Sequence, residues 1–260
     1  MQFPDGLARD GVARIAAALQ ERLRARAPAV HCITNAVAQN FTANMLLSAG
    51  AVPSMTLDRD EIAAFVGRSD ALLVNLGTLD RERREATHIA VDTAVENDIP
   101  WVLDPVFIDR SPLRAGFARE LVARAPAVVR LNHSEFAALA GAAPTPEAVA
   151  AYAHQHKLVV ALSGKTDLVS DGARMAAVAN GDPLMTKITA MGCAGSALVA
   201  AALGVEPDAW RAAAGALVFI GVAGEIAAEK AEGPGSFAVA IVDALHRLDG
   251  PELVARAKVT

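Results

Sequence analysis

Short apolar runs alternate with longer segments of helical spacing along most of this chain, and this alternation limits its fold more than any other feature. The apolar runs are residues 30–33, 52–55, 70–75, 100–104, 127–130 and 158–162. The segments with helical spacing are residues 7–27, 40–48, 82–97, 133–141 and 147–156. Strands that alternate with helices in this way imply parallel β-α units.

The composition suits this arrangement. Apolar residues make up 53% of the 260 residues and aromatic residues only 4%, so Ala, Val, Leu and Ile must build the core. Such side chains suit helices packed on a buried parallel sheet, and the chain is long enough to bury one. Ser170-Asp171-Gly172 predicts a β-hairpin over 167–178, and helices dominate from Gly192 onward. We predict one α/β domain over 1–260, with three layers (α/β/α) and a mostly parallel central sheet.

Charge, cysteine content and hydropathy argue against several classes of protein. A net charge of −5 and a pI near 5.7 disfavour a nucleic-acid or anionic-membrane partner. The two cysteines, Cys32 and Cys193, match no disulfide framework or zinc spacing. The N-terminus lacks a signal-peptide pattern, and the apolar stretch 212–223 is too short to span a bilayer. We therefore expect a cytoplasmic protein.

Polar residues follow five of the predicted strands. These exits are residues 34–35, 75–78, 104–106, 132–135 and 163–165. In open α/β sheets the ligand crevice lies beyond the carboxyl ends of the strands. One polar exit would be ordinary loop chemistry, whereas five predict a binding site.

The run from Thr186 to Ala201 passes from β-branched residues through a small-residue turn into an alanine-rich helix. Cys193 lies where that helix should begin. Unpaired N–H groups and a partial positive charge make a helix start a ready anion site. A thiol at this position can have a lowered pKa and could act as a weak base or a polar positioner. The alternative is a small buried residue, the commonest state of free cysteine.

From Pro28 to Phe237, several motifs together resemble the hydroxyethylthiazole kinase family of the ribokinase-like superfamily. They are His31-Cys-Ile-Thr-Asn35, Asn40-Phe-Thr-Ala-Asn44, Asn75-Leu-Gly-Thr-Leu79, Leu103-Asp-Pro-Val106, Arg130 with Asn132 and Glu135, and Gly233-Pro-Gly-Ser-Phe237. The resemblance implies a ribokinase-like fold and phosphorylation of 4-methyl-5-(2-hydroxyethyl)thiazole in thiamin salvage, with ATP and Mg²⁺. It also implies a homotrimer with active sites between subunits. The apolar helices near 212–227 are a candidate interface.

The resemblance assigns roles to residues at the strand exits. Asp104 and Glu135 match the acidic pair that holds Mg²⁺, and their oxygens are suitable ligands; otherwise Asp104 caps a turn and Glu135 lies in a solvated helical turn. Arg130 matches an ATP-contacting arginine, a fork suited to phosphate, or it forms a surface salt bridge. Ser163 is expected to contact ATP or shape a turn. Asn132 is expected to order the cluster or to cap a helix.

The remaining assignments concern the substrate. Cys193 falls where other ribokinase-like enzymes have a catalytic aspartate, next to the substrate hydroxyl. Met55 matches a substrate-contacting methionine, with core packing as the alternative. Asn35 is expected at the pocket rim, or as a residue that holds the turn after the first strand. Ala190 occupies the position of a substrate- and phosphate-facing glycine.

Two segments depart from the family pattern. Phe107-Ile-Asp-Arg110 stands where Gly-Ala-Gly-Ala is usual, and Ala190 adds a β-carbon that disfavours positive φ. These changes leave two further hypotheses beside an active thiazole kinase. One is a catalytically weak relative that binds nucleotide or thiazole as a sensor or scaffold. The other is a kinase of a different small heteroaromatic alcohol, such as a pyrimidine or a vitamin-B6 alcohol.

Overall fold

The computed structural model describes residues 7–260, with side chains from residue 11 onward. Its centre is an eight-stranded sheet in the order β2-β1-β3-β4-β5-β6-β7-β8. Pairing is parallel from β2 to β6 and antiparallel from β6 through β7 to β8. The strands are β1 (Ala29–Ile33), β2 (Val52–Ser54), β3 (Ala71–Asn75), β4 (Trp101–Asp104), β5 (Val128–Asn132), β6 (Val159–Ser163), β7 (Asp167–Ser170) and β8 (Met175–Val178).

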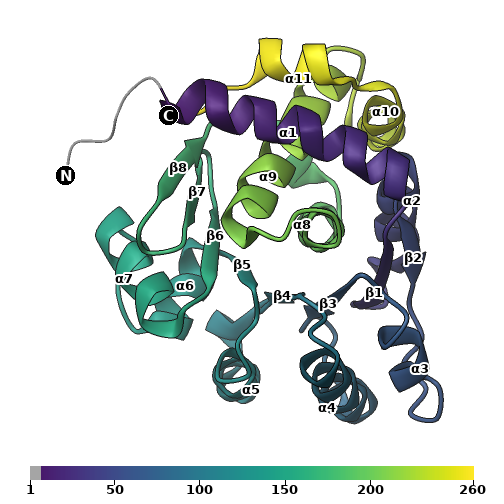
Figure 1. The fold of residues 1–260 in the computed structure, drawn as a ribbon, viewed down its shortest axis with the longest axis vertical. Coiled ribbons are helices and arrows are strands. Elements are labelled where there is room, and N and C mark those ends of the chain that lie inside the picture. Colours follow the sequence, from purple (N-terminus) through teal and green to yellow (C-terminus); the bar gives the residue numbers. More distant parts are fainter. Residues whose placement is uncertain (1–6) are drawn as a thin grey trace.

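Helices cover both faces of the sheet, as Figure 1 shows. One face carries α3 (Ile62–Val66), α4 (Arg81–Glu96), α5 (Pro112–Val122), α6 (His133–Ala140) and α7 (Pro146–His156). The other carries α2 (Gln39–Ala49), α8 (Met191–Leu203) and α9 (Ala209–Ala228), and α1 (Leu7–Arg26), α10 (Pro234–Arg247) and α11 (Gly250–Arg256) pack outside them. The short 3-10 helices are η1 (Ile108–Arg110) and η2 (Pro183–Lys187). The predicted α/β/α arrangement with a mostly parallel sheet is confirmed.

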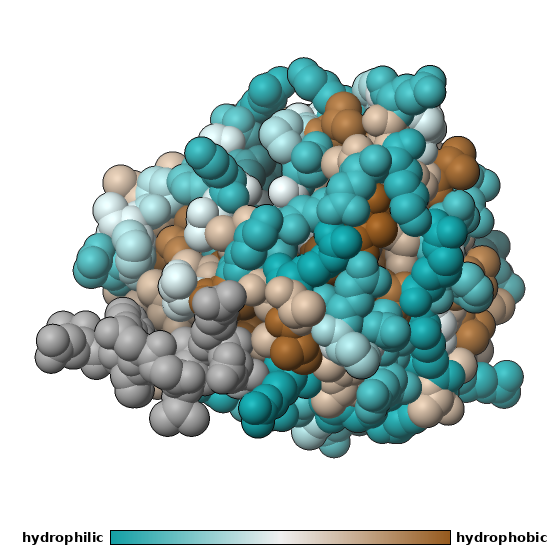
Figure 2. All heavy atoms as spheres, turned by 90° about the horizontal axis from the view of Figure 1, so that it is seen from above, coloured by the Kyte–Doolittle hydropathy of each residue, from teal (hydrophilic) through white to brown (hydrophobic). Residues whose placement is uncertain are grey.

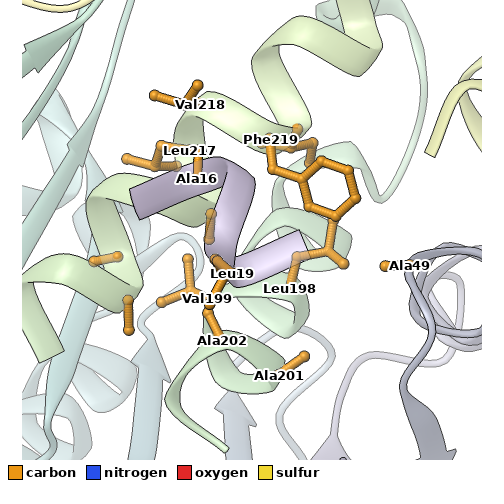
Figure 3. Packing of buried hydrophobic residues seen from close by; sticks show 14 of the residues in the cluster. Ala16, Leu19, Ala49, Leu198, Val199, Ala201, Ala202, Leu217, Val218 and Phe219 are labelled. Atoms are coloured by element: carbon orange, nitrogen blue, oxygen red, sulfur yellow. The ribbon is translucent and has the colours of Figure 1, made fainter. Parts of the chain in front are cut away.

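The outer tier of helices completes a core built mainly from small side chains. In Figure 3, Ala16 of α1 lies beside Leu217 of α9, and Leu19 of α1 lies beside Val199 of α8. Alanine at so many contacts lets helix backbones approach closely. Figure 2 shows that the face above this tier is largely hydrophilic, with separate apolar patches.

The helix α9 corrects two expectations drawn from its apolar sequence. It has 20 residues and, by length and composition, is the one helix of the described chain that could cross a bilayer, so the argument from short length was wrong. However, 83% of its apolar window is buried inside the protein. The stretch 212–227 therefore belongs to the core between α1, α8 and α10 and does not form an exposed interface.

Most predicted elements are confirmed to within about two residues, including the hairpin of β7 and β8. The exceptions are the short α3 and the eleven-residue α5, which the sequence analysis does not identify. A signal for α5 exists, because Ser111 caps it and Pro112 occupies its first turn. The strand β5 also continues to Asn132, which extends the sheet toward the predicted site.

Candidate active site

A cleft of about 1230 Å³ lies at the carboxyl ends of the parallel strands. All five predicted polar exits contribute to its wall, which includes Asn35, Gly77, Val106, Asn132 and Ser163. The sheet register explains the convergence, because Asn75 pairs with Asp104 and Asn132 pairs with Ser163 on neighbouring strands. The opposite wall comes from residues 179–193 and from Leu217, Ile220 and Gly221 of α9.

Four polar side chains, two that line the cleft and two buried next to it, form a continuous line. The Asn75 side-chain amide donates to Asp104 Oδ2 at 2.7 Å, and Asn75 Oδ1 accepts from Asn35 Nδ2 at 3.3 Å. The same Asn35 nitrogen donates to Cys193 Sγ at 3.1 Å. The line therefore joins the last residues of β3 and β4, and a residue that follows β1, to the first turn of α8.

The two carboxylates assigned to the metal are both buried. Asp104 is 5% exposed and Glu135 is 6% exposed. Burial raises the pKa of Asp104, with the Arg130 charge opposing it, and burial likewise raises the pKa of Glu135 against backbone hydrogen bonds from Asn132 and Phe107. Within the described chain, no three His, Cys, Asp or Glu side chains group together as a ready-made metal site. The alternative of a solvated Glu135 is wrong.

Glu135 also has a structural function. Its Oε2 accepts from the Asn132 backbone nitrogen at 2.9 Å, while the Asn132 side chain accepts from the Glu135 nitrogen at 3.0 Å. This reciprocal pair is a capping box at the start of α6. The helix-cap alternative for Asn132 is thus confirmed, and its side chain also lines the cleft.

Arg130 reaches from β5 to the first turn of α8. Its Nη1 donates to the Gly192 carbonyl at 2.8 Å and to Ser196 Oγ at 3.3 Å. A β-carbon at Gly195 would lie 3.2 Å from Nη2, so the small residue lets the guanidinium pack against the helix. Arg130 forms no ion pair within the described chain, which argues against the salt-bridge alternative. Its positive charge instead faces the cleft.

The expectation of a lowered pKa for Cys193 is wrong. Cys193 is the third residue of α8, yet burial and the charge of Asp104 raise its pKa to about 11. The hydrogen bond from Asn35 and the nearby Asn75 amide act in the opposite direction but do not outweigh burial. The thiol is therefore neutral at pH 7. Cys32 is fully buried in the core, as expected, and its pKa is raised to about 12 by burial.

The sequence profile of the hydroxyethylthiazole kinase family matches residues 20–250 of this chain. The chain belongs to the hydroxyethylthiazole kinase family. It is 44% identical over 242 residues to the hydroxyethylthiazole kinase of Klebsiella pneumoniae, an alignment that covers 88% of this chain and 94% of the relative. It is 42% identical over 244 residues to the probable hydroxyethylthiazole kinase of Agrobacterium fabrum, with 94% of each chain covered.

The fold agrees with this assignment. The structure of the hydroxyethylthiazole kinase protein from Pyrococcus horikoshii superimposes with a TM-score of 0.91 at 36% identity, covering 95% of this chain and 98% of that chain. A more distant solved structure, described as a ribokinase-like superfamily protein from Enterococcus faecalis, shares only the fold, with a TM-score of 0.69 at 12% identity. The resemblance read from the motifs is thus confirmed at the level of family and fold.

Both segments that depart from the hydroxyethylthiazole kinase pattern contain a residue in a backbone conformation that favours glycine. Ala190, the residue that caps α8, has φ 71°, and Phe107 has φ 58°. An L-residue in this left-handed region costs roughly 1–2 kcal/mol. The chain therefore keeps the backbone geometry expected of glycine without having glycine. Both residues line the cleft.

Of the other predicted site residues, three line the cleft and one does not. Ser163 and Ala190 line the cleft, as does Asn35, whose side chain also holds Cys193. Met55 does not line it; this half-buried side chain packs against the core cluster, in agreement with the packing alternative for this subunit. Its role as a substrate contact stays a prediction.

Sequence reasoning also missed residues that line the cleft. Arg114 of α5 lies there and donates to the Val106 carbonyl at 3.3 Å, and Asp167 accepts from the Gly164 nitrogen at 2.8 Å. Neither residue lies directly after a parallel strand, the position at which the sequence predicts site residues. The unrecognised helix α5 explains the omission of Arg114.

Proposed function

We propose that this chain transfers the terminal phosphoryl group of ATP to the hydroxyl group of 4-methyl-5-(2-hydroxyethyl)thiazole, a step of thiamin salvage. The observation that carries the proposal is that Cys193 and Arg130 line one cleft in a chain of this family, with Asp104 buried close to both. The three residues come from three distant parts of the sequence. Together they combine a polar group for an alcohol, an acidic group for a cation and a cation for phosphate.

Phosphoryl transfer needs mainly positioning and charge stabilisation. The first turn of α8 lines the cleft, and its N–H groups and helix dipole favour a developing negative charge. Arg130 adds a full positive charge beneath the same turn. Ser163 and Asn132 line the same cleft, and we expect them to contact the polyphosphate of the nucleotide.

Asp104 and Glu135 are suited to hold Mg²⁺ beside the phosphates. Magnesium typically binds one or two protein carboxylates and completes its coordination with water and phosphate oxygens. Burial raises the pKa of both carboxylates, and a nearby cation would offset that penalty. When bound, the ion supplies charge neutralisation between the transferred group and the nucleotide.

The neutral Cys193 thiol fits a positioning function better than that of a general base. Asn35 donates to its sulfur, so the thiol hydrogen is left to point toward the substrate hydroxyl. Such a contact fixes the direction of attack without removing a proton in advance. We therefore propose the positioning function for Cys193 in preference to the weak-base function.

We further propose a cytoplasmic homotrimer with substrate sites completed by neighbouring subunits. Exposed apolar side chains near β1, β2, α2 and α3 support an interface there: Val37, Leu47, Val52 and Phe65 are between 43% and 69% exposed. Val37 also lines the cleft. Sedimentation velocity tests the assembly, and a species with only monomer mass would contradict it.

A catalytically weak relative is the second candidate. The strained backbone at Phe107 and Ala190 favours it. Both residues line the cleft and carry a side chain where glycine would let the backbone approach phosphate closely. A coupled ADP-release assay with Mg²⁺-ATP and thiazole, pyrimidine and pyridoxal alcohols separates the candidates. Turnover with the thiazole alcohol supports the first, preference for another alcohol supports a changed substrate, and nucleotide binding without turnover supports the weak relative.

Asp104→Asn in the same assay tests the metal site. We expect weaker binding of Mg²⁺, seen as a changed Mg²⁺ dependence with a higher concentration for half-maximal rate, because the variant loses the charge that binds the ion. An unchanged magnesium requirement would remove Asp104 from the proposed site.

A further inference from the structure

Two buried amides connect the proposed metal carboxylate to the proposed positioning thiol. Asn75 is 1% exposed and Asn35 is 6% exposed. The Asn75 amide nitrogen bonds Asp104, its oxygen bonds the Asn35 nitrogen, and that nitrogen also bonds Cys193. The Asn75 amide can serve both neighbours because it donates through its nitrogen and accepts through its oxygen.

Gly77 keeps the space that these two amides occupy. Its backbone nitrogen donates to Asn75 Oδ1 at 2.9 Å. A β-carbon at this position would lie 2.8 Å from Asn35 Cβ and 2.9 Å from Asn75 Oδ1. Both separations are shorter than the contacts that β-carbons make in proteins, so any larger residue at position 77 would displace the two amides. Gly77 thus provides a second, independent sign that the arrangement is built into the fold.

We propose that Asn75 is a positioning residue that holds Asp104 and, through Asn35, Cys193 in one hydrogen-bonded unit. The proposal rests on the kinase activity proposed above. Asn75 does not line the cleft and therefore acts through the residues on either side of it. Because both ends of the unit are held by the same side chain, the metal position and the direction of the substrate hydroxyl are coupled.

Kinetics of Asn75→Ala and Asn35→Ala provide the first test. We expect Asn75→Ala to lower kcat about 10–100-fold and to raise the Mg²⁺ concentration for half-maximal rate about 10-fold, which are typical effects of losing a supporting hydrogen bond. Asn35→Ala should lower kcat but leave the Mg²⁺ requirement within about twofold, since it does not contact Asp104. An Mg²⁺ requirement unchanged in Asn75→Ala would overturn the proposal.

A double-mutant cycle separates positioning from simple loss of folded protein. In a Cys193→Ala background, Asn75→Ala should lower kcat at saturating Mg²⁺ by much less than it does in the wild-type background. If the double variant lost kcat by the product of the two single-variant losses, the link between Asn75 and Cys193 would be overturned. Asn97→Ala, which removes an exposed asparagine at the end of α4, is the matched control and should leave kcat unchanged.

Gly77→Ala tests the same unit without altering either amide, and it serves if Asn75→Ala fails to fold. We expect a loss of kcat comparable with that of Asn75→Ala. Gly116→Ala is its control, because a β-carbon at Gly116 in α5 meets nothing within 4 Å. Equal kinetics of the two glycine variants and the wild type would overturn the proposal.

A measurement without substrate or metal distinguishes this proposal from the proposed function. In nuclear magnetic resonance spectra of the full chain, the side-chain amide hydrogens of Asn35 should exchange slowly with solvent. Asn75→Ala or Gly77→Ala should speed that exchange at least about 10-fold, whereas Gly116→Ala should not. If wild-type protein phosphorylates no alcohol but this result holds, the function fails and the hydrogen-bonded unit stands. Unchanged exchange in both variants would overturn the unit itself.

Discussion

The backbone nitrogen of Phe107 donates a hydrogen bond to Glu135 Oε1 at 2.9 Å, which ties the loop after β4 to the start of α6. Phe107 has φ 58°, a conformation that a phenylalanine adopts only when its surroundings impose it. Glu135 supplies part of that constraint, and its second oxygen caps α6. One buried carboxylate therefore has two structural functions in addition to its proposed contact with magnesium.

Replacement of Glu135 should consequently destabilise the protein even without metal. Glu135→Ala leaves the backbone N–H groups of Phe107 and Asn132 without their acceptor, and we expect a loss of about 2 kcal/mol in the free energy of unfolding. Urea denaturation in the presence of a chelator measures it. Glu147→Ala is the matched control, because Glu147 also lies in the first turn of a helix but is exposed. Equal stability of the two variants would show that Glu135 has no structural function.

Ala190→Gly should stabilise the protein and leave the fold intact. Glycine relieves the cost of the left-handed conformation, which exceeds the extra entropy that glycine gives the unfolded chain, so we expect a gain of about 1 kcal/mol. For a chain of this size that is a rise in Tm of about 2–4 °C. Calorimetry measures the change. Ala151→Gly, at an exposed position within α7, should instead lose about 1 kcal/mol. A destabilised Ala190→Gly would contradict the strain argument.

The Cys193 thiol should react slowly despite its position in the first turn of α8. With a pKa of about 11, only about one molecule in a thousand carries the thiolate at pH 8, and the fraction rises as the pH increases toward 11. Rates of alkylation by iodoacetamide, followed by mass spectrometry from pH 7 to 10, test this directly. Denatured protein is the reference for an ordinary thiol. A native alkylation pKa below 8 would restore the weak-base hypothesis.

Cys193→Ala should lower kcat more than it raises KM for the thiazole alcohol. The reason is that a positioning contact matters most when the hydroxyl attacks, whereas the rest of the ring still binds the cleft. Steady-state kinetics with saturating Mg²⁺-ATP measure both constants. Cys193→Ser, which keeps a neutral hydroxyl at the same place, should retain more kcat than the alanine variant. An unchanged kcat in Cys193→Ala would remove Cys193 from the mechanism.

Site residues whose positions follow from strand topology could be predicted from the sequence. Properties that depend on burial, such as the pKa of Cys193, could not. Strand ends such as Asn132 and Ser163 meet because parallel pairing places them at one edge, and the alternation of strands and helices is visible in the sequence. The pKa of Cys193 depends instead on Asp104 and on side chains far away in the chain. Likewise, the apolar stretch of α9 identifies a buried helix only once α1 is known to cover it.

His31 should make stability depend on pH in the acid range. Its imidazole is buried in β1, where Nδ1 lies 2.8 Å from Ser54 Oγ and Nε2 lies 3.1 Å from the Thr56 carbonyl. Burial lowers its pKa from 6.5 to about 4 against the opposing effects of Thr56 and Glu61. The folded state thus binds fewer protons than the unfolded state between pH 4 and 6.5, so this stabilisation is present above 6.5 and is lost as the pH falls toward 4.

The expected contribution of His31 is about 3 kcal/mol across that range, from the linkage between pKa and stability. Urea denaturation of wild type and His31→Gln at pH 4.5, 5.5 and 7 measures it. The difference in free energy of unfolding between the two proteins should shrink toward low pH, since glutamine has no proton to gain. His154→Gln, which replaces an exposed histidine of α7, is the control for the change of residue type. A difference for His31→Gln that stays constant with pH would mean that the His31 imidazole has the same pKa in the folded and unfolded protein.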